Sequence, residues 1–192
     1  MTEAARYPRN IDLSGVSIDL RRMTPSDQGA VLAFARSVPR HDLLFMPRDI
    51  TEEKVTNAWS EANERGHIHT ILAFEGEAVV GCAGLFTDPH SWSPHVGELR
   101  VLVSPDSRHK GLGRVLIQET FIQALALDLK KLIAQMTVDQ AGAIAIFEEL
   151  GFRGEALLKD HVLDDEKIGH DIVILSCDVS SAASLKRAYS DS

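Results

Sequence analysis

A short basic loop with two glycines is the stretch of this sequence whose residue types and spacing best suit anion binding. It follows an apolar run that stops at Pro105 and leads into a helical pattern; it reads Arg108, His109, Lys110, Gly111, Leu112, Gly113 and Arg114. The first N–H groups of a helix lack internal partners and carry partial positive charge, so a phosphate could bind there. Gly111 and Gly113 would let the backbone approach it closely. On spacing alone, a plain tight turn explains the loop equally well.

The strand that leads into the loop carries a carboxylate, Glu98, that could act as a general base. Partial burial on a central strand would raise its pKa toward the range in which a base is useful at neutral pH. The structural alternative is an ion pair with Arg100, which lies two residues further on and therefore on the same face of the strand. Both interpretations stay open at this point.

Two histidines near the C-terminal end are further candidates for catalysis. His161 and His170 fall on the two strands of the last predicted hairpin, so either could orient a substrate or relay a proton. A hydrogen-bonded structural role is the alternative for each. We expect no metal, because the other histidines on strands and loops lack the helical His-x-x-x-His spacing of a zinc site: His67, His69, His90 and His95.

The elements that position these residues follow from hydrophobic periodicity and turn residues. Strands are predicted over residues 16–22, 68–74, 78–86, 96–103, 132–138, 152–163 and 168–177. Helices are predicted after a Thr24 cap, after a Thr51 cap, from Leu112 to Leu129, and over 140–150. The order β-α-α-β-β-β-α-β-α-β-β indicates an α/β (α+β) protein whose mixed sheet has helices on both faces.

Length and composition indicate one domain. The chain has 192 residues, 44% of them hydrophobic, which allows one substantial core. We assign residues 16–178 to that domain, 1–15 to a flexible polar N-terminal segment and 179–192 to a polar C-terminal tail. Cys82 and Cys177 fall in apolar runs, which favours buried thiols in a reducing compartment over a disulfide.

Charge and hydropathy disfavour two classes of partner. The net charge of −8 argues against nucleic acid, which is bound by neutralising phosphates with Lys and Arg. No apolar run approaches the length of a membrane span, and residues 1–15 contain no hydrophobic signal core, so no membrane partner is expected. We therefore expect a cytoplasmic protein.

The loop and another motif together resemble the acetyl-CoA-binding sequences of the GNAT superfamily of N-acetyltransferases. The first match is Arg108-x-x-Gly111-x-Gly113 behind the apolar strand. The other match starts at Gln140 and is similar to the family's Asn-x-x-Ala-x-x-x-Tyr-x-x-x-Gly-Phe helix. The resemblance covers residues 16–178 and includes the order of elements. Gln140 stands where Asn is common, and Phe147 stands where the family often has a Tyr that protonates the leaving thiolate.

The resemblance implies the GNAT fold and transfer of an acetyl group from acetyl-CoA to a primary amine by direct attack. It implies that backbone amides at residues 108–114 hold the pyrophosphate. The strand at Leu102 and Val103 would form β-type hydrogen bonds with the pantetheine arm and polarise the thioester carbonyl. Gln140 and Phe147 would contribute to the cofactor site, and Glu98 matches a catalytic Glu of many members.

The reaction requires a neutral amine, so a general base that deprotonates the amine lowers the barrier more than a general acid that protonates the thiolate. At pH 7 a lysine-like amine with a pKa of about 10.4 needs roughly 4.6 kcal/mol to lose its proton, and an α-amine near 8 needs only about 1.4. A thiol titrates near about 8.5, so thiolate can leave and take a proton from water, and the lack of a Tyr at Phe147 is tolerable.

The identity of the acceptor stays open. It could be an amine of a small molecule or of a protein, including a protein lysine, and a homodimer is also open. Because Phe147 has no hydroxyl, a catalytically weak module that binds acetyl-CoA for regulation is a further alternative. Acceptor specificity is expected in residues 41–49, 88–94 and 164–166. The acidic residues of the last segment suit a cationic amine, but a solvated turn explains them as well.

Overall fold

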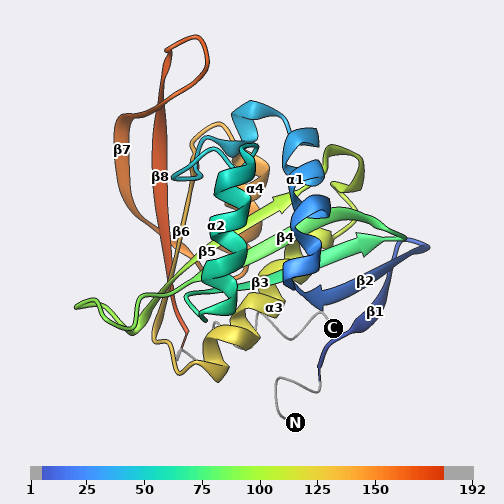
Figure 1. The fold of residues 1–192 in the computed structure, drawn as a ribbon. Coiled ribbons are helices and arrows are strands. Elements are labelled where there is room, and N and C mark those ends of the chain that lie inside the picture. Colours follow the sequence, from blue (N-terminus) through green and yellow to red (C-terminus); the bar gives the residue numbers. More distant parts are fainter. Residues whose placement is uncertain (1–5, 180–192) are drawn as a thin grey trace.

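The computed structural model describes residues 6–179, which form one eight-stranded mixed sheet with helices on both faces (Figure 1). The strands are β1 Arg9–Leu13, β2 Val16–Arg22, β3 Ile68–Glu75, β4 Ala78–Phe86, β5 Val96–Val103, β6 Lys131–Thr137, β7 Arg153–Leu163 and β8 Gly169–Asp178. The α-helices are α1 Gln28–Ser37, α2 Glu53–Glu64, α3 Leu112–Ala126 and α4 Ala141–Glu149. Three short 3₁₀ segments are η2 Pro25–Asp27, η3 Arg40–Leu43 and η4 Pro105–Ser107.

The strand order across the sheet is β1-β2-β3-β4-β5-β6-β8-β7. β5 and β6 run parallel, and the other neighbouring pairs are antiparallel. The predicted mixed sheet with helices on both faces is therefore confirmed, and the predicted element order holds from β2 onward.

The N-terminal segment is the largest departure from the prediction. A loose end is predicted for residues 1–15, but Arg9–Leu13 form β1 and pair with β2, with Ile11 opposite Ile18. The N-terminal segment is attached to α3 through Glu119. This glutamate is only 2% exposed, and its carboxylate accepts hydrogen bonds from side chains of the N-terminal segment. The donors are Arg6 (2.7 Å), Tyr7 (2.5 Å) and Arg9 (2.7 Å). The predicted tail 179–192 lies outside the described residues apart from Val179.

Two helix ends also differ from the prediction. Leu129 is predicted on the face of the third helix, but α3 ends at Ala126, and Leu129 is buried beyond it. Thr51 is predicted to cap the second helix, but the N-cap of α2 is Glu52. The Thr51 hydroxyl instead donates to the Asp49 carboxylate at 2.6 Å, so the threonine closes the turn that precedes the helix.

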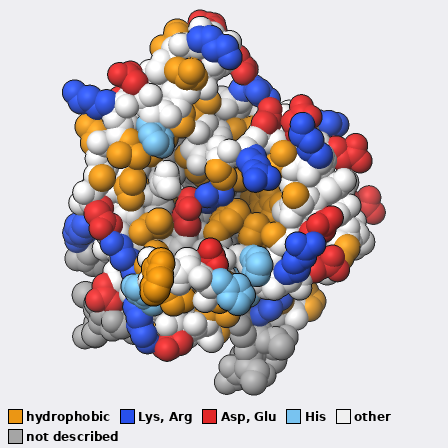
Figure 2. Space-filling model, turned by 60° about the vertical axis from the view of Figure 1, so that its left-hand side comes forward, with side chains coloured by type: hydrophobic (Ala, Val, Ile, Leu, Met, Phe, Trp, Pro, Cys, Tyr) orange, Lys and Arg blue, Asp and Glu red, His pale blue; other side chains and the backbone are white. Residues whose placement is uncertain are grey.

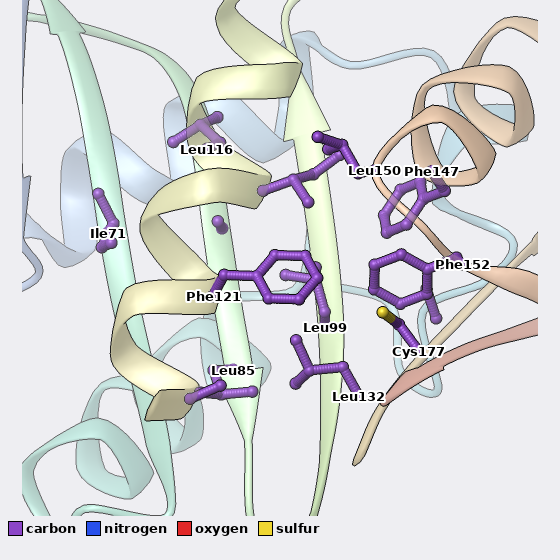
Figure 3. Packing of buried hydrophobic residues seen from close by; sticks show 14 of the residues in the cluster. Ile71, Leu85, Leu99, Leu116, Phe121, Leu132, Phe147, Leu150, Phe152 and Cys177 are labelled. Atoms are coloured by element: carbon purple, nitrogen blue, oxygen red, sulfur yellow. The ribbon is translucent and has the colours of Figure 1, made fainter. Parts of the chain in front are cut away.

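Each face of the sheet carries its own hydrophobic cluster. α1 and α2 cover one face, and α3 and α4 cover the other (Figure 1). Residues of β3 belong alternately to the two clusters, because successive side chains of a strand point to opposite faces of the sheet. Ile71 belongs to the cluster on the face covered by α3, and Leu72 belongs to the cluster on the face covered by α1. Figure 3 shows Phe121 of α3 packed beside Leu99 of β5. The central strands are therefore buried on both faces and fixed in position.

Candidate active site

The central strands β5 and β6 separate part-way along their length. Their parallel ladder joins Val96 to Lys131, Gly97 to Leu132 and Glu98 to Ile133, and it ends there. Beyond this point β5 keeps its antiparallel partner β4 as far as Val103, while β6 pairs with β8. One edge of β5 over Leu99–Val103 is therefore not used by β6. An extended chain could add to this edge as a strand does, through main-chain hydrogen bonds.

The predicted phosphate loop leads directly from this open edge to a helix N-terminus. η4 follows β5, and Gly111 is the N-cap of α3 with φ +88°, a left-handed conformation that favours glycine. The first helical hydrogen bond runs from the N–H of Val115 to the carbonyl of Gly111 at 3.2 Å. No side chain of residues 6–179 caps this end of α3. A Cβ at Gly111 would meet nothing within 4 Å, so the space beside this residue is open.

The basic residues of the loop differ in whether they form ion pairs and with which elements. The Arg108 guanidinium donates to the Asp42 carboxylate of η3 at 2.6 Å and to the Val103 carbonyl at 3.2 Å. Arg114 is paired with Glu149 of α4. Within residues 6–179, Lys110 has no such ion-pair partner. Arg108 thus also ties the loop to η3, a contact that the sequence did not predict.

The apolar and aromatic members of the predicted cofactor set face the interior. Leu102 and Leu112 are 5% and 2% exposed, so only their backbone groups could meet a ligand. His109 is exposed and has a left-handed φ of 61°. Phe147 is 5% exposed, and its ring packs edge-to-face on Phe152 with centroids 4.9 Å apart (Figure 3). The position is filled by core packing, and it supplies no hydroxyl.

Glu98 lies on β5 at the last paired position before the strands separate. Its carboxylate accepts hydrogen bonds from Arg100 at 2.8 Å (Nε) and 2.7 Å (Nη2). The Arg100 guanidinium in turn lies 4.1 Å above the centre of the Phe86 ring. The structural alternative of an ion pair is therefore present, and it holds the carboxylate oriented on the strand.

The two histidine candidates are in different surroundings. The His170 Nε2 lies 2.8 Å from the Asp164 carboxylate, and its ring is 5.0 Å from that of His41 in η3. The pKa of the Asp164 carboxyl lies below its usual range, chiefly because of the His170 hydrogen bond. His161 is exposed and next to Val162, which pairs with His170. The register of β7 is irregular between Leu158 and Val162, so His161 itself has no partner residue opposite it on β8.

An open pocket of about 470 Å³ lies beside this histidine cluster. It is lined by two segments far apart in the sequence, residues 40–49 and 162–166. Both were predicted to set acceptor specificity, and the third predicted segment, 88–94, does not line the pocket. Figure 2 shows a face of the molecule on which hydrophobic side chains lie in a hollow edged by charged and His side chains.

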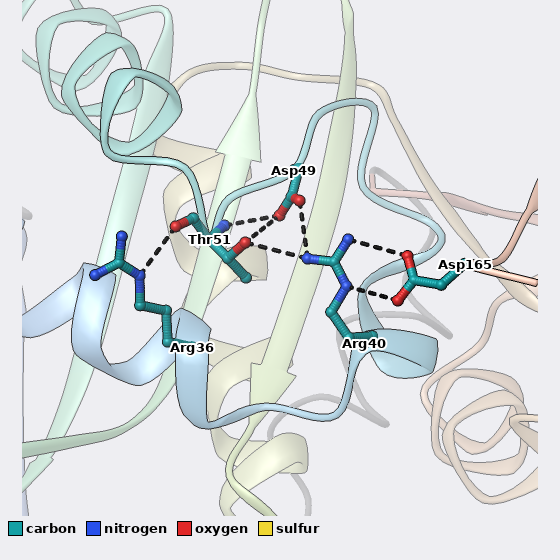
Figure 4. A network of polar contacts seen from close by, with 5 residues as sticks. All are labelled: Arg36, Arg40, Asp49, Thr51 and Asp165. Atoms are coloured by element: carbon teal, nitrogen blue, oxygen red, sulfur yellow. Dashed lines mark hydrogen bonds and ion pairs between the residues drawn. The ribbon is translucent and has the colours of Figure 1, made fainter.

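Arg40 joins the two walls of the pocket. Its guanidinium donates to Asp165 of the β7–β8 turn at 3.1 Å and to Asp49 at 2.9 Å (Figure 4). Two of the acidic groups of the pocket are thus already paired with a cation. Within the part of the chain that the structure describes, the Glu166 carboxylate has no ion-pair partner.

Comparison with known proteins now identifies the family. The model of the acetyltransferase (GNAT) family matches residues 30–152, which is more than half of the chain. The chain belongs to the GNAT acetyltransferase family. It is accordingly an acetyl-CoA-dependent N-acetyltransferase, and the predicted family is confirmed.

Relatives and solved structures agree with this family. An uncharacterized N-acetyltransferase, YjgM of Escherichia coli (strain K12), is 27% identical over 135 residues, 69% of this chain and 80% of that protein. An N-acetyltransferase from Staphylococcus aureus Mu50 has a TM-score of 0.75 at 18% identity, covering 85% of this chain and 99% of that one. Ribosomal-protein-alanine N-acetyltransferase from Brucella melitensis has a TM-score of 0.73 at 24% identity, covering 83% and 98%. At these identities the structures establish the fold.

A structure with bound ligand is also similar. The acetyltransferase yncA from Salmonella typhimurium, solved with its cofactor acetyl-CoA, has a TM-score of 0.73 at 20% identity and covers 86% of this chain and 96% of that one. In the chain described here, Gln140 is the N-cap of α4, and its carbonyl accepts hydrogen bonds from the backbone amides of Ala143 and Ile144 at 3.0 Å. That backbone role starts the helix and leaves the expected contact of Gln140 with the cofactor a prediction.

Three further side chains at this site are not among the residues predicted individually, although residue 41 begins the predicted acceptor segment 41–49. His41, Asp139 and Arg40 have their partners on other elements, so no local spacing marks them. Within residues 6–179, no group of three or more His, Cys, Asp or Glu side chains is arranged to hold a metal ion. In the same part of the chain, no helix is long and apolar enough to cross a membrane.

Proposed function

We propose that this GNAT enzyme transfers the acetyl group of acetyl-CoA to a primary amine by direct attack, with Glu98 as the general base. The observation that carries the proposal is the continuity of three features: the separated edge of β5, the loop after it and the uncapped start of α3. Glu98 stands at the point where the strands separate. The acceptor would be an amine of a small molecule or of a protein.

In this proposal the backbone holds the acyl donor. The N–H groups at the start of α3, from Gly111 to Arg114, would hold the pyrophosphate, with Lys110 adding charge. The free edge of β5 at Leu102 and Val103 would bond the pantetheine arm. When bound, acetyl-CoA supplies the acetyl group and a thiol as the leaving group.

The role proposed for Glu98 follows from the protons of the reaction. A primary ammonium gives up two protons in becoming an amide, and the leaving thiolate takes up one of them. The net reaction therefore releases one proton, and a carboxylate at the site assists by accepting it. Arg100 would keep the Glu98 carboxylate oriented through its two hydrogen bonds.

The pocket between residues 40–49 and 162–166 is the proposed entry for the acceptor. Its walls combine apolar side chains, such as Leu44 and Met46, with charged ones. Because Asp49 and Asp165 share the single positive charge of Arg40, and Arg48 also lines the pocket, its walls are not uniformly acidic. This arrangement supports an amine that also carries apolar surface over a polyamine with several charges.

A panel of amines tests the proposal directly. Purified protein is incubated with acetyl-CoA and each amine in turn: amino acids, diamines, arylalkylamines and peptides with a free N-terminus or a lysine. Thiol release is measured against a sample without amine, and the product is identified by mass spectrometry. We expect release that depends on one amine class and a product heavier by one acetyl group. Tight binding of acetyl-CoA without amine-dependent release would favour the regulatory alternative and overturn the proposal.

A further inference from the structure

The distal part of the β7–β8 hairpin extends beyond the rest of the sheet. The ladder between β6 and β8 ends where Thr137 pairs with Ile172, so residues 159–170 have no third strand beside them within residues 6–179. In Figure 1 this part of the hairpin, drawn in orange and red, rises above the rest of the molecule. A two-stranded ribbon without further packing is only marginally stable in water. We call residues 159–170 the arm.

The arm joins the sheet through an irregular stretch of β7. The register of β7 against β8 shifts between Leu158 and Val162, and Asp160 within this stretch has a left-handed φ of 48°. The backbone amide of Asp160 donates to a side chain, the Asp171 carboxylate, at 2.9 Å. Hinges are usually a few residues in loops or at the ends of elements that absorb changes in φ and ψ. The interrupted pairing around Asp160 therefore has the properties of a hinge.

The turn at the tip of the arm is bonded internally. The Asp164 carboxylate accepts the backbone amides of Glu166 and Ile168 at 2.9 Å each, and it lies 2.8 Å from the Nε2 of His170. The Asp164 amide also donates to the Ile168 carbonyl at 3.1 Å. All of these partners belong to the arm, so the tip can move as a unit without losing the bonds.

The tip is attached to the body of the protein mainly by a polar contact. Leu163 and Ile168, on either side of the turn, are 59% and 53% exposed, so they contribute little apolar packing. Arg40 of η3 donates to the Asp165 carboxylate of the turn at 3.1 Å (Nε) and 3.2 Å (Nη2) (Figure 4). Both side chains are more than half exposed, so this ion pair is weak and is screened by salt.

We propose that the arm is a hinged lid over the pocket, and that the ion pair between Arg40 and Asp165 is the latch that holds it closed. Bending at Asp160 lifts the tip as a unit and separates the two walls of the pocket, residues 162–166 and residues 40–49. Because the latch is one exposed ion pair, opening is easy and becomes easier as the ionic strength rises. This inference goes beyond the proposed function, because the motion itself needs no acceptor.

Pulsed electron paramagnetic resonance between two spin labels measures the position of the arm without any ligand. Glu166→Cys at the tip and Glu61→Cys on the exposed face of α2 carry the labels. The native thiols Cys82 and Cys177 are buried and therefore unreactive. At low salt we expect one dominant, short distance. Addition of Asp165→Asn should increase the population at longer distance by about two- to fivefold, and high salt should have the same effect on the unmodified latch.

Two arginine variants complete this measurement. Arg40→Gln removes the other half of the latch and should give the distances of Asp165→Asn. Arg36→Gln is the matched control, because Arg36 donates to the Thr51 carbonyl and leaves the latch intact. It should give the wild-type distances. The same distribution in the wild type and in both latch variants would overturn the proposal, and so would a long-distance population that does not respond to salt.

A cross-link tests whether the lid must open for catalysis, and this step rests on the proposed function. In Arg40→Cys/Asp165→Cys, a bismaleimide joins the two walls, and the same protein modified with N-ethylmaleimide is the matched open form. Acetyl-CoA affinity should be equal in both forms, whereas kcat/KM for the amine found in the panel should be lower in the joined form by about tenfold or more. Equal kcat/KM in the two forms would overturn the role of the lid in catalysis. If neither form acetylates any amine, the proposed function fails, while the distances alone decide whether the arm is a lid.

Discussion

The two sides of the site differ in how the chain builds them. The proposed donor side comes from one continuous stretch, β5, η4 and the start of α3. The proposed acceptor side joins η3, the turn after β6 and the β7–β8 turn, through contacts such as His41 to Asp139 and Arg40 to Asp165. These partners lie 98 and 125 positions apart in the sequence.

This difference has a chemical counterpart. The proposed donor side offers mostly backbone groups in a fixed local conformation, which would suit the one acyl donor, acetyl-CoA. The acceptor side offers side chains, each of which can change without altering the fold. We therefore expect changes on the donor side to affect the binding of acetyl-CoA, and changes on the acceptor side to affect the choice of amine. The predictions below test this separation.

The largest effect is expected at Gly111. In Gly111→Asp a negative charge stands where the pyrophosphate meets the helix N-terminus, and like charges in contact cost several kcal/mol. The affinity for acetyl-CoA, measured by calorimetry, should fall by about a hundredfold or more. The fold should survive, because a Cβ meets nothing within 4 Å and Asp tolerates a left-handed φ.

Gly111→Asn is the matched control, since it has the same shape and tolerates the same φ without the charge. It should keep most of the affinity. If folded Gly111→Asp binds acetyl-CoA as the wild type does, the loop does not hold the pyrophosphate, and the donor side has been assigned to the wrong stretch.

Glu98 lies where the two sides meet, and its replacement should separate binding from chemistry. In Glu98→Gln the proton acceptor is lost and the shape is kept, so kcat/KM at pH 7 should fall by about a hundredfold while acetyl-CoA affinity stays near wild type. The defect should shrink as the pH rises, because more of the amine is then neutral in solution.

Glu61→Gln on the exposed face of α2 is the control for the loss of a carboxylate. It should leave the pH profile unchanged. If Glu98→Gln matches the wild type at every pH, Glu98 serves only as the partner of Arg100, and the base belongs elsewhere.

A smaller effect, on stability alone, is expected at Glu119, behind the donor side. Glu119→Gln leaves Arg6 and Arg9 without their buried carboxylate. The free energy of unfolding should fall by about 2–3 kcal/mol, which lowers Tm by roughly 4–12 °C. Scanning calorimetry at pH 7 measures this, and a change below about 1 °C would show that the N-terminal segment does not stabilise α3.

The same variant gives a pH dependence with a definite sign. Burial alone would raise the pKa of Glu119, but hydrogen bonds from Arg6 and Tyr7 outweigh it, and the pKa is lowered. A lowered pKa adds stability at pH values above the unfolded value of about 4.3, and this stability is lost as the pH falls through the folded value. The Tm difference between wild type and Glu119→Gln should therefore be largest at neutral pH and disappear in acid.

The continuity of the proposed donor side is also why it could be proposed from the sequence alone. The strand, the glycine loop and the helix are neighbours along the chain, and the alternative for Glu98 was visible because Arg100 is two residues away. β1 was missed because a short strand with polar neighbours resembles a loose end until its partners on α3 are known. The contacts of His41 could not be predicted, because Asp139 and His170 lie far from it in the sequence and come near it only in the folded chain.

The smallest effect, and the most informative about the acceptor, is expected at Arg40. Arg40→Gln should lower Tm by no more than about 4 °C, because exposed ion pairs contribute about 1 kcal/mol or less. It frees Asp49 and Asp165, however, and makes the pocket wall more negative. At low salt the KM for a diamine should fall by about two- to fivefold, and the change should disappear at high salt, where exposed charges are screened.

Arg36→Gln is the matched control, because Arg36 belongs to the same network but, within residues 6–179, donates to the Thr51 carbonyl at 3.1 Å and to no carboxylate (Figure 4). It should leave the KM of every amine unchanged. Acetyl-CoA affinity should be the same in both variants and in the wild type, since neither arginine lies in the loop. If Arg40→Gln weakened acetyl-CoA binding as much as it changed the KM of the amine, the two sides would not be separable. The contact from Arg108 to Asp42 would then be the connection through which η3 influences the donor side.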